Sequence, residues 1–174
     1  CGVRATTTNE ARSALMTAKT VVLGIGNTLL GDEGAGVYAM HALKVRADSL
    51  DIGDVDYLDG GTLSFTLAAP IGDAQRLIVI DAAQLKDKPG TVRLFEGDAM
   101  DDFLGSQRKA SVHEVGLIDL MVMARLAGTF PARRALIGIQ PEYLDWADAP
   151  TPAVAAAIPR ACDLALDLMQ RWRT

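Results

Sequence analysis

The feature that most constrains the fold is a short apolar strand that runs into a glycine-rich loop and then into a helix. Residues 20–26 read Thr-Val-Val-Leu-Gly-Ile-Gly, the pattern of a strand buried on both faces. Residues 33–45 then carry apolar side chains at helical spacing, at Val37, Met40 and Leu43. A strand buried on both faces needs cover on both sides, so this β-loop-α unit predicts a parallel sheet enclosed by helices.

The rest of the chain alternates in the same way. Further strands are expected at residues 55–58, 77–80, 91–95 and 136–139, and helices at residues 63–69, 112–126 and 153–172. Strands that alternate with helices imply right-handed crossovers and helices on both faces of the sheet. Strand 91–95 follows a Pro-Gly turn and is expected to form a hairpin-like or antiparallel edge.

Two helix boundaries carry specific signals. Ser111 and Glu114 have the form of a capping box, which predicts that a helix begins near residue 112. Pro152 lies near the first turn of the last helix, and Pro159 is expected to kink or restart that helix. No element is predicted in the polar segment 97–108.

Length and composition predict one domain. The chain has 174 residues, of which 49% are apolar and 5% aromatic, enough for one aliphatic core. Residues 1–17 are polar and threonine-rich and are expected to form a flexible N-terminal arm, so residues 18–174 form a single α/β domain. The longest apolar runs, such as residues 77–80, are far below the roughly 18 residues of a membrane span, so membrane insertion is not expected.

Charge and cysteine usage limit the partners. With 17 basic and 22 acidic residues, the net charge of -5 is mild and no Lys/Arg cluster suits a phosphate backbone, which argues against nucleic acid. Cys1 and Cys162 form neither a ligand cluster nor a disulfide framework, which indicates a reduced, cytoplasmic protein, expected to be a monomer. Because the chain begins with Cys1 rather than Met, we expect that preceding residues have been removed.

The glycine-rich loop does not match a nucleotide-binding motif. A dinucleotide fingerprint starting at residue 24 needs glycine where Leu29 stands, and the Gly-Lys-Ser/Thr ending of a P-loop is absent. The loop offers acids instead, because Asp32 is placed to cap the following helix and Glu33 falls in its first turn. An alternative is that both carboxylates only stabilise the helix N-terminus, by about 0.3–1 kcal/mol through the dipole.

A second acid, Asp81, follows four aliphatic residues of a buried strand. Its carboxylate is therefore expected where an open parallel sheet has its ligand crevice, beyond the carboxyl ends of the strands. Charged residues rarely occupy such places without a partner. The alternative is that Asp81 caps the next turn.

The two histidines differ in their expected surroundings. His41 lies in the middle of the first helix and is most simply a partly exposed surface residue. His113 falls in the first turn of the helix that Ser111 is expected to cap, where the dipole disfavours imidazolium and keeps the ring neutral. A neutral imidazole is the form that binds a metal.

Together, Glu33, Asp81 and His113 form a mixed oxygen and nitrogen donor set. Such a set suits a divalent ion such as nickel, zinc, iron or manganese, and three ligands leave positions open for substrate or water. A bound ion accelerates hydrolysis by polarising the scissile carbonyl or by lowering the pKa of a water, and both routes are open here. No Ser/His/Asp or Cys/His arrangement points to an internal nucleophile.

Five sequence blocks, in this order, resemble the hydrogenase maturation endopeptidases. The blocks are GIGNTLLGDEG at residues 24–34, LDGGT at 58–62, LIVIDA at 77–82, SVHEVGL at 111–117 and GIQPE at 138–142. The resemblance covers roughly residues 21–171. These enzymes trim the C-terminal extension from the large subunit of nickel-iron hydrogenases after nickel insertion.

The resemblance implies a fold, a site and a partner. The fold is a three-layer α/β/α sandwich with a twisted, mainly parallel five-stranded sheet. The metal-binding and catalytic residues are those matching Glu33, Asp81 and His113. The partner is a nickel-iron hydrogenase large-subunit precursor, whose nickel arrives with the substrate and serves as the recognition element, with other divalent ions able to substitute. The remaining expected substrate-binding residues are Asn27, Asp59, Gly60 and Thr62.

Two other functions stay open at this point. The same three ligands suit a nickel-binding or hydrogenase-docking chaperone without peptidase activity, which would leave the mass of the precursor unchanged. They also suit a small metallohydrolase acting on amides or esters, which would turn over small model substrates.

Overall fold

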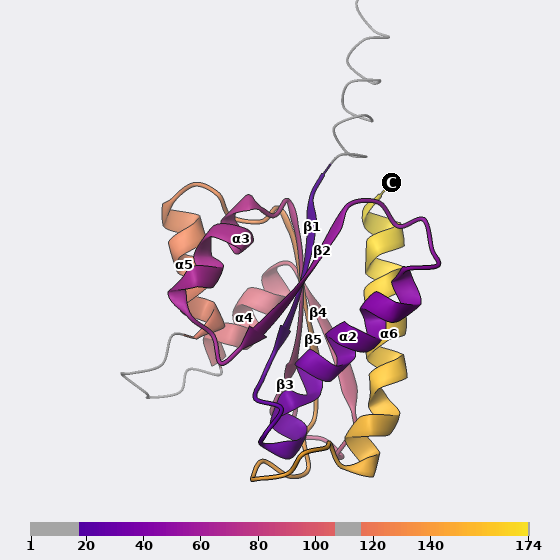
Figure 1. The fold of residues 1–174 in the computed structure, drawn as a ribbon. Coiled ribbons are helices and arrows are strands. Elements are labelled where there is room, and N and C mark those ends of the chain that lie inside the picture. Colours follow the sequence, from indigo (N-terminus) through magenta and orange to yellow (C-terminus); the bar gives the residue numbers. More distant parts are fainter. Residues whose placement is uncertain (1–17, 107–115, 174) are drawn as a thin grey trace, which may run out of the picture.

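The computed structural model describes residues 18–106 and 116–173, which form a five-stranded sheet covered by helices (Figure 1). In chain order the elements are β1 (Thr20–Ile25), η1 (Gly31–Gly34), α2 (Ala35–Ala47), β2 (Val55–Gly61), η2 (Phe65–Leu67), α3 (Ala68–Asp73), β3 (Arg76–Ala82), β4 (Val92–Glu96), α4 (Asp98–Ser106), α5 (Leu117–Leu126), β5 (Arg133–Ile139) and α6 (Pro152–Trp172). The expected N-terminal arm, residues 1–17, lies outside the described residues.

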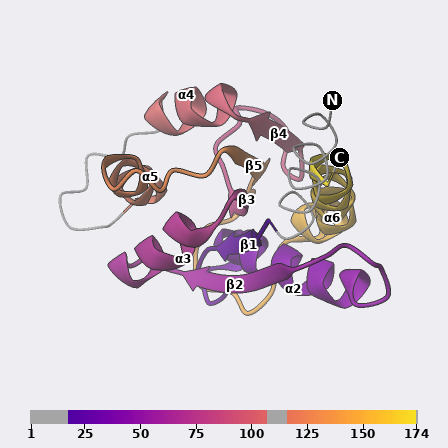
Figure 2. The same cartoon turned by 90° about the horizontal axis from the view of Figure 1, so that it is seen from above.

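The sheet has the order β2-β1-β3-β5-β4, which Figure 2 shows end-on. The pairs β1–β2, β1–β3 and β3–β5 are parallel, and β4 pairs antiparallel with β5. The four parallel strands therefore end at one edge of the sheet, called here the carboxyl edge, and begin at the opposite amino edge. The mainly parallel sheet and its antiparallel edge strand are confirmed.

Helices cover both faces of the sheet. Helices α2 and α6 pack together on one face, and α3, α4 and α5 cover the other (Figure 1). Alternate residues of a strand serve opposite cores: Val22 joins the α2/α6 side, while Val21 and Leu23 join the other side. Each such aliphatic side chain, fully buried, contributes about 1.5–3 kcal/mol, so two-sided burial makes β1 a rigid base for the loop that follows it. The three-layer α/β/α sandwich is confirmed.

The boundary predicted for the helix after residue 111 is wrong. Helix α5 begins at Leu117, because Gly116 is extended with φ -86° and ψ 161°. Glycine is a poor helix former, and the Asp119 carboxylate accepts a hydrogen bond from the Gly116 amide at 2.8 Å, which fixes the helix start there. His113 therefore does not lie in the first turn of α5, and its own position lies outside the described residues.

Two further differences concern helices. Residues 98–106 form α4, which sequence reasoning missed because the segment is polar; Met100 supplies its buried anchor. Pro152 is the first residue of α6, as expected, but the helix neither ends nor restarts at Pro159. The Pro159 carbonyl also accepts a hydrogen bond from the Arg46 side chain at 3.1 Å, which ties α6 to α2 at this point. Among the helices of the described ranges, none is long and apolar enough to cross a membrane.

Candidate active site

Glycines bring the Glu33 turn against the ends of two central strands. A Cβ on Gly36 would lie 2.1 Å from the Ile80 carbonyl oxygen and 2.4 Å from that of Ile25, so only glycine permits this approach of α2. A Cβ on Gly26, whose φ is 131°, would lie 1.7 Å from the Glu33 carbonyl oxygen. Glu33, half-buried in η1, is thereby held over the carboxyl edge, one turn before α2 rather than inside it.

Asp81 lies at the same edge. It is the sixth residue of β3, which continues to Ala82, and it pairs with Gly138 of β5. Turn η1 contacts β3, so the elements that carry Glu33 and Asp81 are neighbours. Both side chains are half-buried. The structure therefore brings the two predicted acids to one edge of the sheet.

The third predicted ligand, His113, lies outside the described residues. Within the described ranges, no three His, Cys, Asp or Glu side chains gather closely enough to hold a metal ion. The three-ligand site therefore stays a prediction, for which the structure supplies the place of two members.

Asp32 has a different role from the one predicted. Its side chain is fully buried and does not cap α2; the N-cap residue of α2 is Gly34, which has no side-chain cap. Asp32 instead accepts hydrogen bonds from the amides of Glu142 (2.8 Å), Tyr143 (3.0 Å) and Thr151 (2.6 Å), and from the Thr151 hydroxyl (3.0 Å). Burial by itself would raise the pKa of Asp32, but these hydrogen bonds outweigh it and hold the pKa below its ordinary value.

Asp32 is thus the clamp of a double loop, defined as residues 26–34 and 140–151. Backbone bonds join the two segments as well: the Gly31 amide donates to the Ala147 carbonyl, the Ala147 amide to Leu29, and the Asp32 amide to Tyr143, each at 3.1 Å. The clamp connects positions more than 100 residues apart, so local sequence patterns give no sign of it. Its consequence is that the backbone on either side of Glu33 is fixed.

The side chain of Gln140 likewise joins two segments of the chain, here next to Asp81. In the sequence, Gln140 stood out only as part of the GIQPE block at residues 138–142. It is buried, and its side-chain oxygen accepts a hydrogen bond from the Leu85 amide at 2.7 Å. Its side-chain nitrogen donates to the Gln84 side chain and to the Pro141 carbonyl, both at 3.1 Å. The segment that follows Asp81 is therefore tied to the end of β5.

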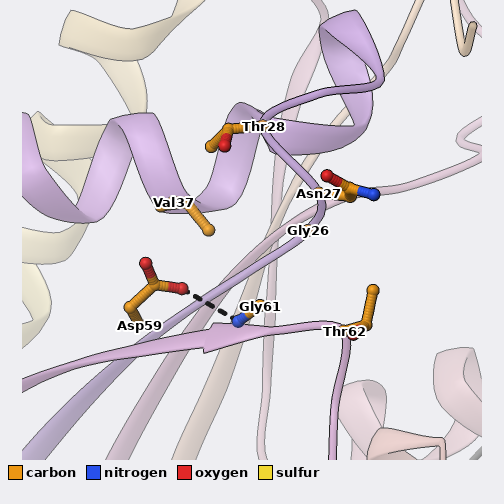
Figure 3. A pocket seen from close by; sticks show the side chains of 7 residues that line it. All are labelled: Gly26, Asn27, Thr28, Val37, Asp59, Gly61 and Thr62. Atoms are coloured by element: carbon orange, nitrogen blue, oxygen red, sulfur yellow. Dashed lines mark hydrogen bonds between the residues drawn. The ribbon is translucent and has the colours of Figure 1, made fainter. Parts of the chain in front are cut away.

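A pocket of about 230 Å³ opens beside this edge, between the loop after β1 and the end of β2 (Figure 3). Its lining residues are Gly26, Asn27, Thr28, Val37, Asp59, Gly61 and Thr62. Three of the four predicted substrate-binding residues, Asn27, Asp59 and Thr62, thus surround one hollow. Gly60 is not among the lining residues; a Cβ there would lie 2.9 Å from Leu23, so its smallness serves packing.

Two side chains of the pocket are held by local hydrogen bonds. The Asn27 side-chain oxygen accepts from the Leu29 amide at 3.0 Å, and one Asp59 oxygen accepts from the Gly61 amide at 2.9 Å. The other Asp59 oxygen lies 4.0 Å from the imidazole of His41. In Figure 3 the Asp59 carboxylate extends from β2 toward the helix that carries Val37. The His41 side chain is 61% exposed, which confirms its expected surface position.

Fold and site together define a class: an α/β/α sandwich with acidic side chains and a pocket at the carboxyl edge of its parallel strands. Comparison with known proteins identifies the family within that class. The family model for hydrogenase maturation proteases matches residues 37–168, so the chain belongs to the hydrogenase maturation protease family.

Curated relatives and solved structures agree with this assignment. The chain is 37% identical over 153 residues to the hydrogenase expression/formation protein HoxM of Cupriavidus necator, covering 87% of this chain and 74% of HoxM. It is 35% identical over 147 residues to the hydrogenase 2 maturation protease of Escherichia coli, covering 84% and 87% of the two chains. The structure of the hydrogenase maturating endopeptidase HybD from E. coli superposes with a TM-score of 0.77 at 32% identity, covering 88% of this chain and 93% of HybD. The chain is accordingly a peptidase, rather than a chaperone without peptidase activity or an unrelated metallohydrolase.

Proposed function

We propose that this peptidase removes the C-terminal extension of a nickel-iron hydrogenase large-subunit precursor after nickel insertion. Membership of the hydrogenase maturation protease family supports the reaction class and the kind of substrate. The observation that carries the proposal is the place of Glu33 and Asp81, two half-buried acids on neighbouring elements at the carboxyl edge. Acids at such an edge are suited to a ligand rather than to the core.

In this proposal the nickel of the precursor is the recognition element. Glu33, Asp81 and His113 complete the coordination of the ion that the precursor brings, which holds the extension in one pose. Oxygen and imidazole donors suit a divalent ion, and a site with three ligands leaves positions for substrate. The pocket lined by Asn27, Asp59 and Thr62 lies at the same edge and receives part of the extension.

The chemistry in this proposal needs no nucleophile from the peptidase. Cys162 is fully buried, its Sγ lies 3.6 Å from the Ala39 carbonyl oxygen, and burial raises the pKa of its thiol, so it is unsuited to attack a peptide bond. A divalent ion accelerates hydrolysis instead by polarising the scissile carbonyl or by activating a water.

A processing assay tests the role of nickel. Nickel-loaded and nickel-free precursors are each incubated with the peptidase, and the loss of the extension is followed by intact-mass measurement. We expect shortening of the nickel-loaded precursor alone. Equal cleavage of both forms would end the proposal that nickel is the recognition element.

Single substitutions test the three ligands in the same assay. Glu33→Gln and Asp81→Asn replace a carboxylate with an amide of nearly equal volume, and His113→Ala removes the imidazole. For each variant we expect a cleavage rate at least about 100-fold lower, as for the loss of a group that acts on the reacting atoms. The matched control is Asp73→Asn on α3, an exposed acid outside both the ligand set and the pocket. If one of these three variants cleaves the precursor at the wild-type rate, the substituted residue is not part of the site.

A further inference from the structure

Exposed apolar side chains gather on the double loop beside Glu33. Leu29 comes from the first segment, and Tyr143, Leu144 and Trp146 come from the second; their exposed fractions lie between 47% and 74%, with Trp146 the most exposed. The two segments are joined by a bridge between Leu30 and Ala147, so the four side chains belong to one region of the surface. Such a gathering marks an interaction site more often than a single exposed leucine does.

The backbone under this surface is fixed. The four hydrogen bonds to Asp32 and the backbone bonds between the two segments restrain residues 142–151, and the Tyr38 hydroxyl donates to the Thr28 carbonyl at 3.2 Å. A side chain that is exposed on a restrained backbone loses little conformational freedom when a partner covers it. The restrained backbone of the double loop therefore lowers the entropic cost of binding a partner at this surface.

The charges around the surface indicate the chemistry of its partner. Glu142, Asp145 and Asp148 are exposed on the second segment, and residues 140–151 contain no Lys, Arg or His. The first segment, residues 26–34, adds Glu33 and again no basic residue. Contact between two copies of this surface would place like charges together, whereas apolar side chains bordered by Lys and Arg would match it.

We propose that the double loop is the docking surface for the folded body of the large-subunit precursor, at an apolar patch bordered by basic side chains. This inference rests on the proposed function and adds the surface and its partner chemistry. Trp146 and Leu144 are its apolar anchors, because large side chains that become fully covered dominate protein interfaces. Docking beside Glu33 brings the extension to the carboxyl edge.

The kinetics of precursor processing test the apolar anchors. Trp146→Ser and Leu144→Ser are expected to raise KM for the nickel-loaded precursor by about 10-fold or more and to leave kcat unchanged, because they remove contacts made equally in the ground and transition states. Leu126→Ser is the matched control, since Leu126 is 84% exposed and lies at the end of α5 that leads to the amino edge. An unchanged KM, or a lower kcat alone, would overturn the inference.

The charge of the partner is tested by association kinetics with immobilised precursor. Asp148→Lys is expected to lower the association rate about 10-fold at low salt and to weaken its dependence on salt. Asp102→Lys on α4 changes the net charge equally and is expected to have little effect. Faster association of Asp148→Lys would contradict the proposed basic partner surface.

These outcomes separate the inference from the proposed function. If the wild-type protein binds the precursor but does not shorten it, the proposed function fails while the anchors remain testable by affinity. If it shortens the precursor with the same KM in Trp146→Ser, only the docking surface fails. Sedimentation of wild-type and Trp146→Ser proteins is expected to give identical masses; a lighter variant would identify a second copy as the occupant and overturn the inference.

Discussion

The two edges of the sheet use charge in opposite ways. At the amino edge, basic side chains are bound to acids and carbonyls: Arg134 contacts Asp98 and Asp101, and Arg133 donates to the Trp172 carbonyl at 2.6 Å. At the carboxyl edge the fully buried acid, Asp32, is satisfied by amides and a hydroxyl, and the exposed acids surround an apolar surface. At the amino edge, charged side chains serve the stability of the fold through ion pairs and hydrogen bonds. At the carboxyl edge, hydrogen bonds to a buried acid fix the backbone, and the exposed side chains face a partner.

The largest effect is expected at the clamp. Asp32→Ala removes the fully buried acceptor of four hydrogen bonds and leaves their partly buried donors unsatisfied, so we expect the free energy of unfolding to fall by about 3 kcal/mol or more. Chemical denaturation measures it. Asp119→Ala is the control, because Asp119 is exposed and, within the part of the chain that the structure describes, accepts a hydrogen bond from the Gly116 amide alone; its cost is about 1 kcal/mol. Equal losses would show that the double loop is not held by Asp32.

The next effect concerns the close approach at the carboxyl edge. Gly36→Ala places a Cβ against the carbonyls of Ile25 and Ile80, and we expect a loss of about 1–3 kcal/mol together with slower precursor processing, because the Glu33 turn must move. Gly105→Ala in α4 meets nothing within 4 Å and is expected to stabilise by up to about 1 kcal/mol. Thermal unfolding and the processing assay compare the two. A stable, fully active Gly36→Ala protein would contradict the packing described for this edge.

At the amino edge we expect a smaller, pH-dependent effect. The hydrogen bond from Arg134, helped by Arg125, holds the pKa of Asp101 below its ordinary value. A lowered pKa in the folded state contributes stability above the unfolded pKa of about 3.9, and this contribution is lost as the pH falls through the folded value. Asp101→Asn should therefore cost about 1–2 kcal/mol at pH 7 and progressively less below about pH 4. A cost that stays constant down to pH 2 would argue against the ion pair.

The smallest effect is expected between the edges, at Tyr57 on β2. Its hydroxyl is buried with no hydrogen-bond partner among the described residues, and burial raises its pKa to about 12. The unfolded tyrosine ionises near pH 10, so stability is lost as the pH rises from about 10 to 12. Tyr57→Phe should change stability at pH 7 by less than about 1 kcal/mol and remove part of the alkaline loss. Denaturation at pH 7 and pH 11 checks both statements, and a large loss at pH 7 would reveal an unseen partner.

Much of the fold was predictable because strands and helices are encoded by local periodicity. The parallel strands and the antiparallel edge follow from runs such as residues 20–26 and 77–80, whose side chains alternate between two cores. The start of α5 was not predictable in this way, because a capping-box pattern at Ser111 competed with the extended Gly116. Helix α4 was missed because its anchor, Met100, stands in a polar segment.

The candidate site likewise has features that local sequence patterns predicted and features that they did not. The meeting of Glu33 and Asp81 at one edge was predictable, since both follow apolar strands of a parallel sheet and such strands end together. The role of Asp32 was not, because its partners lie 110 to 119 residues away and an acid next to a helix start looks locally like a cap. The meeting of these acids with His113 stays a prediction.

The sequence by itself determined the β/α alternation, the two-sided burial of the central strands and the acids at the strand ends, because each is written in the spacing of neighbouring residues. Only the tertiary structure decided that Asp32 is a buried clamp and that Tyr143, Leu144 and Trp146 share one surface with Leu29. A hydrogen bond between distant segments depends on which backbone amides the fold places opposite a carboxylate, and no local pattern specifies that geometry.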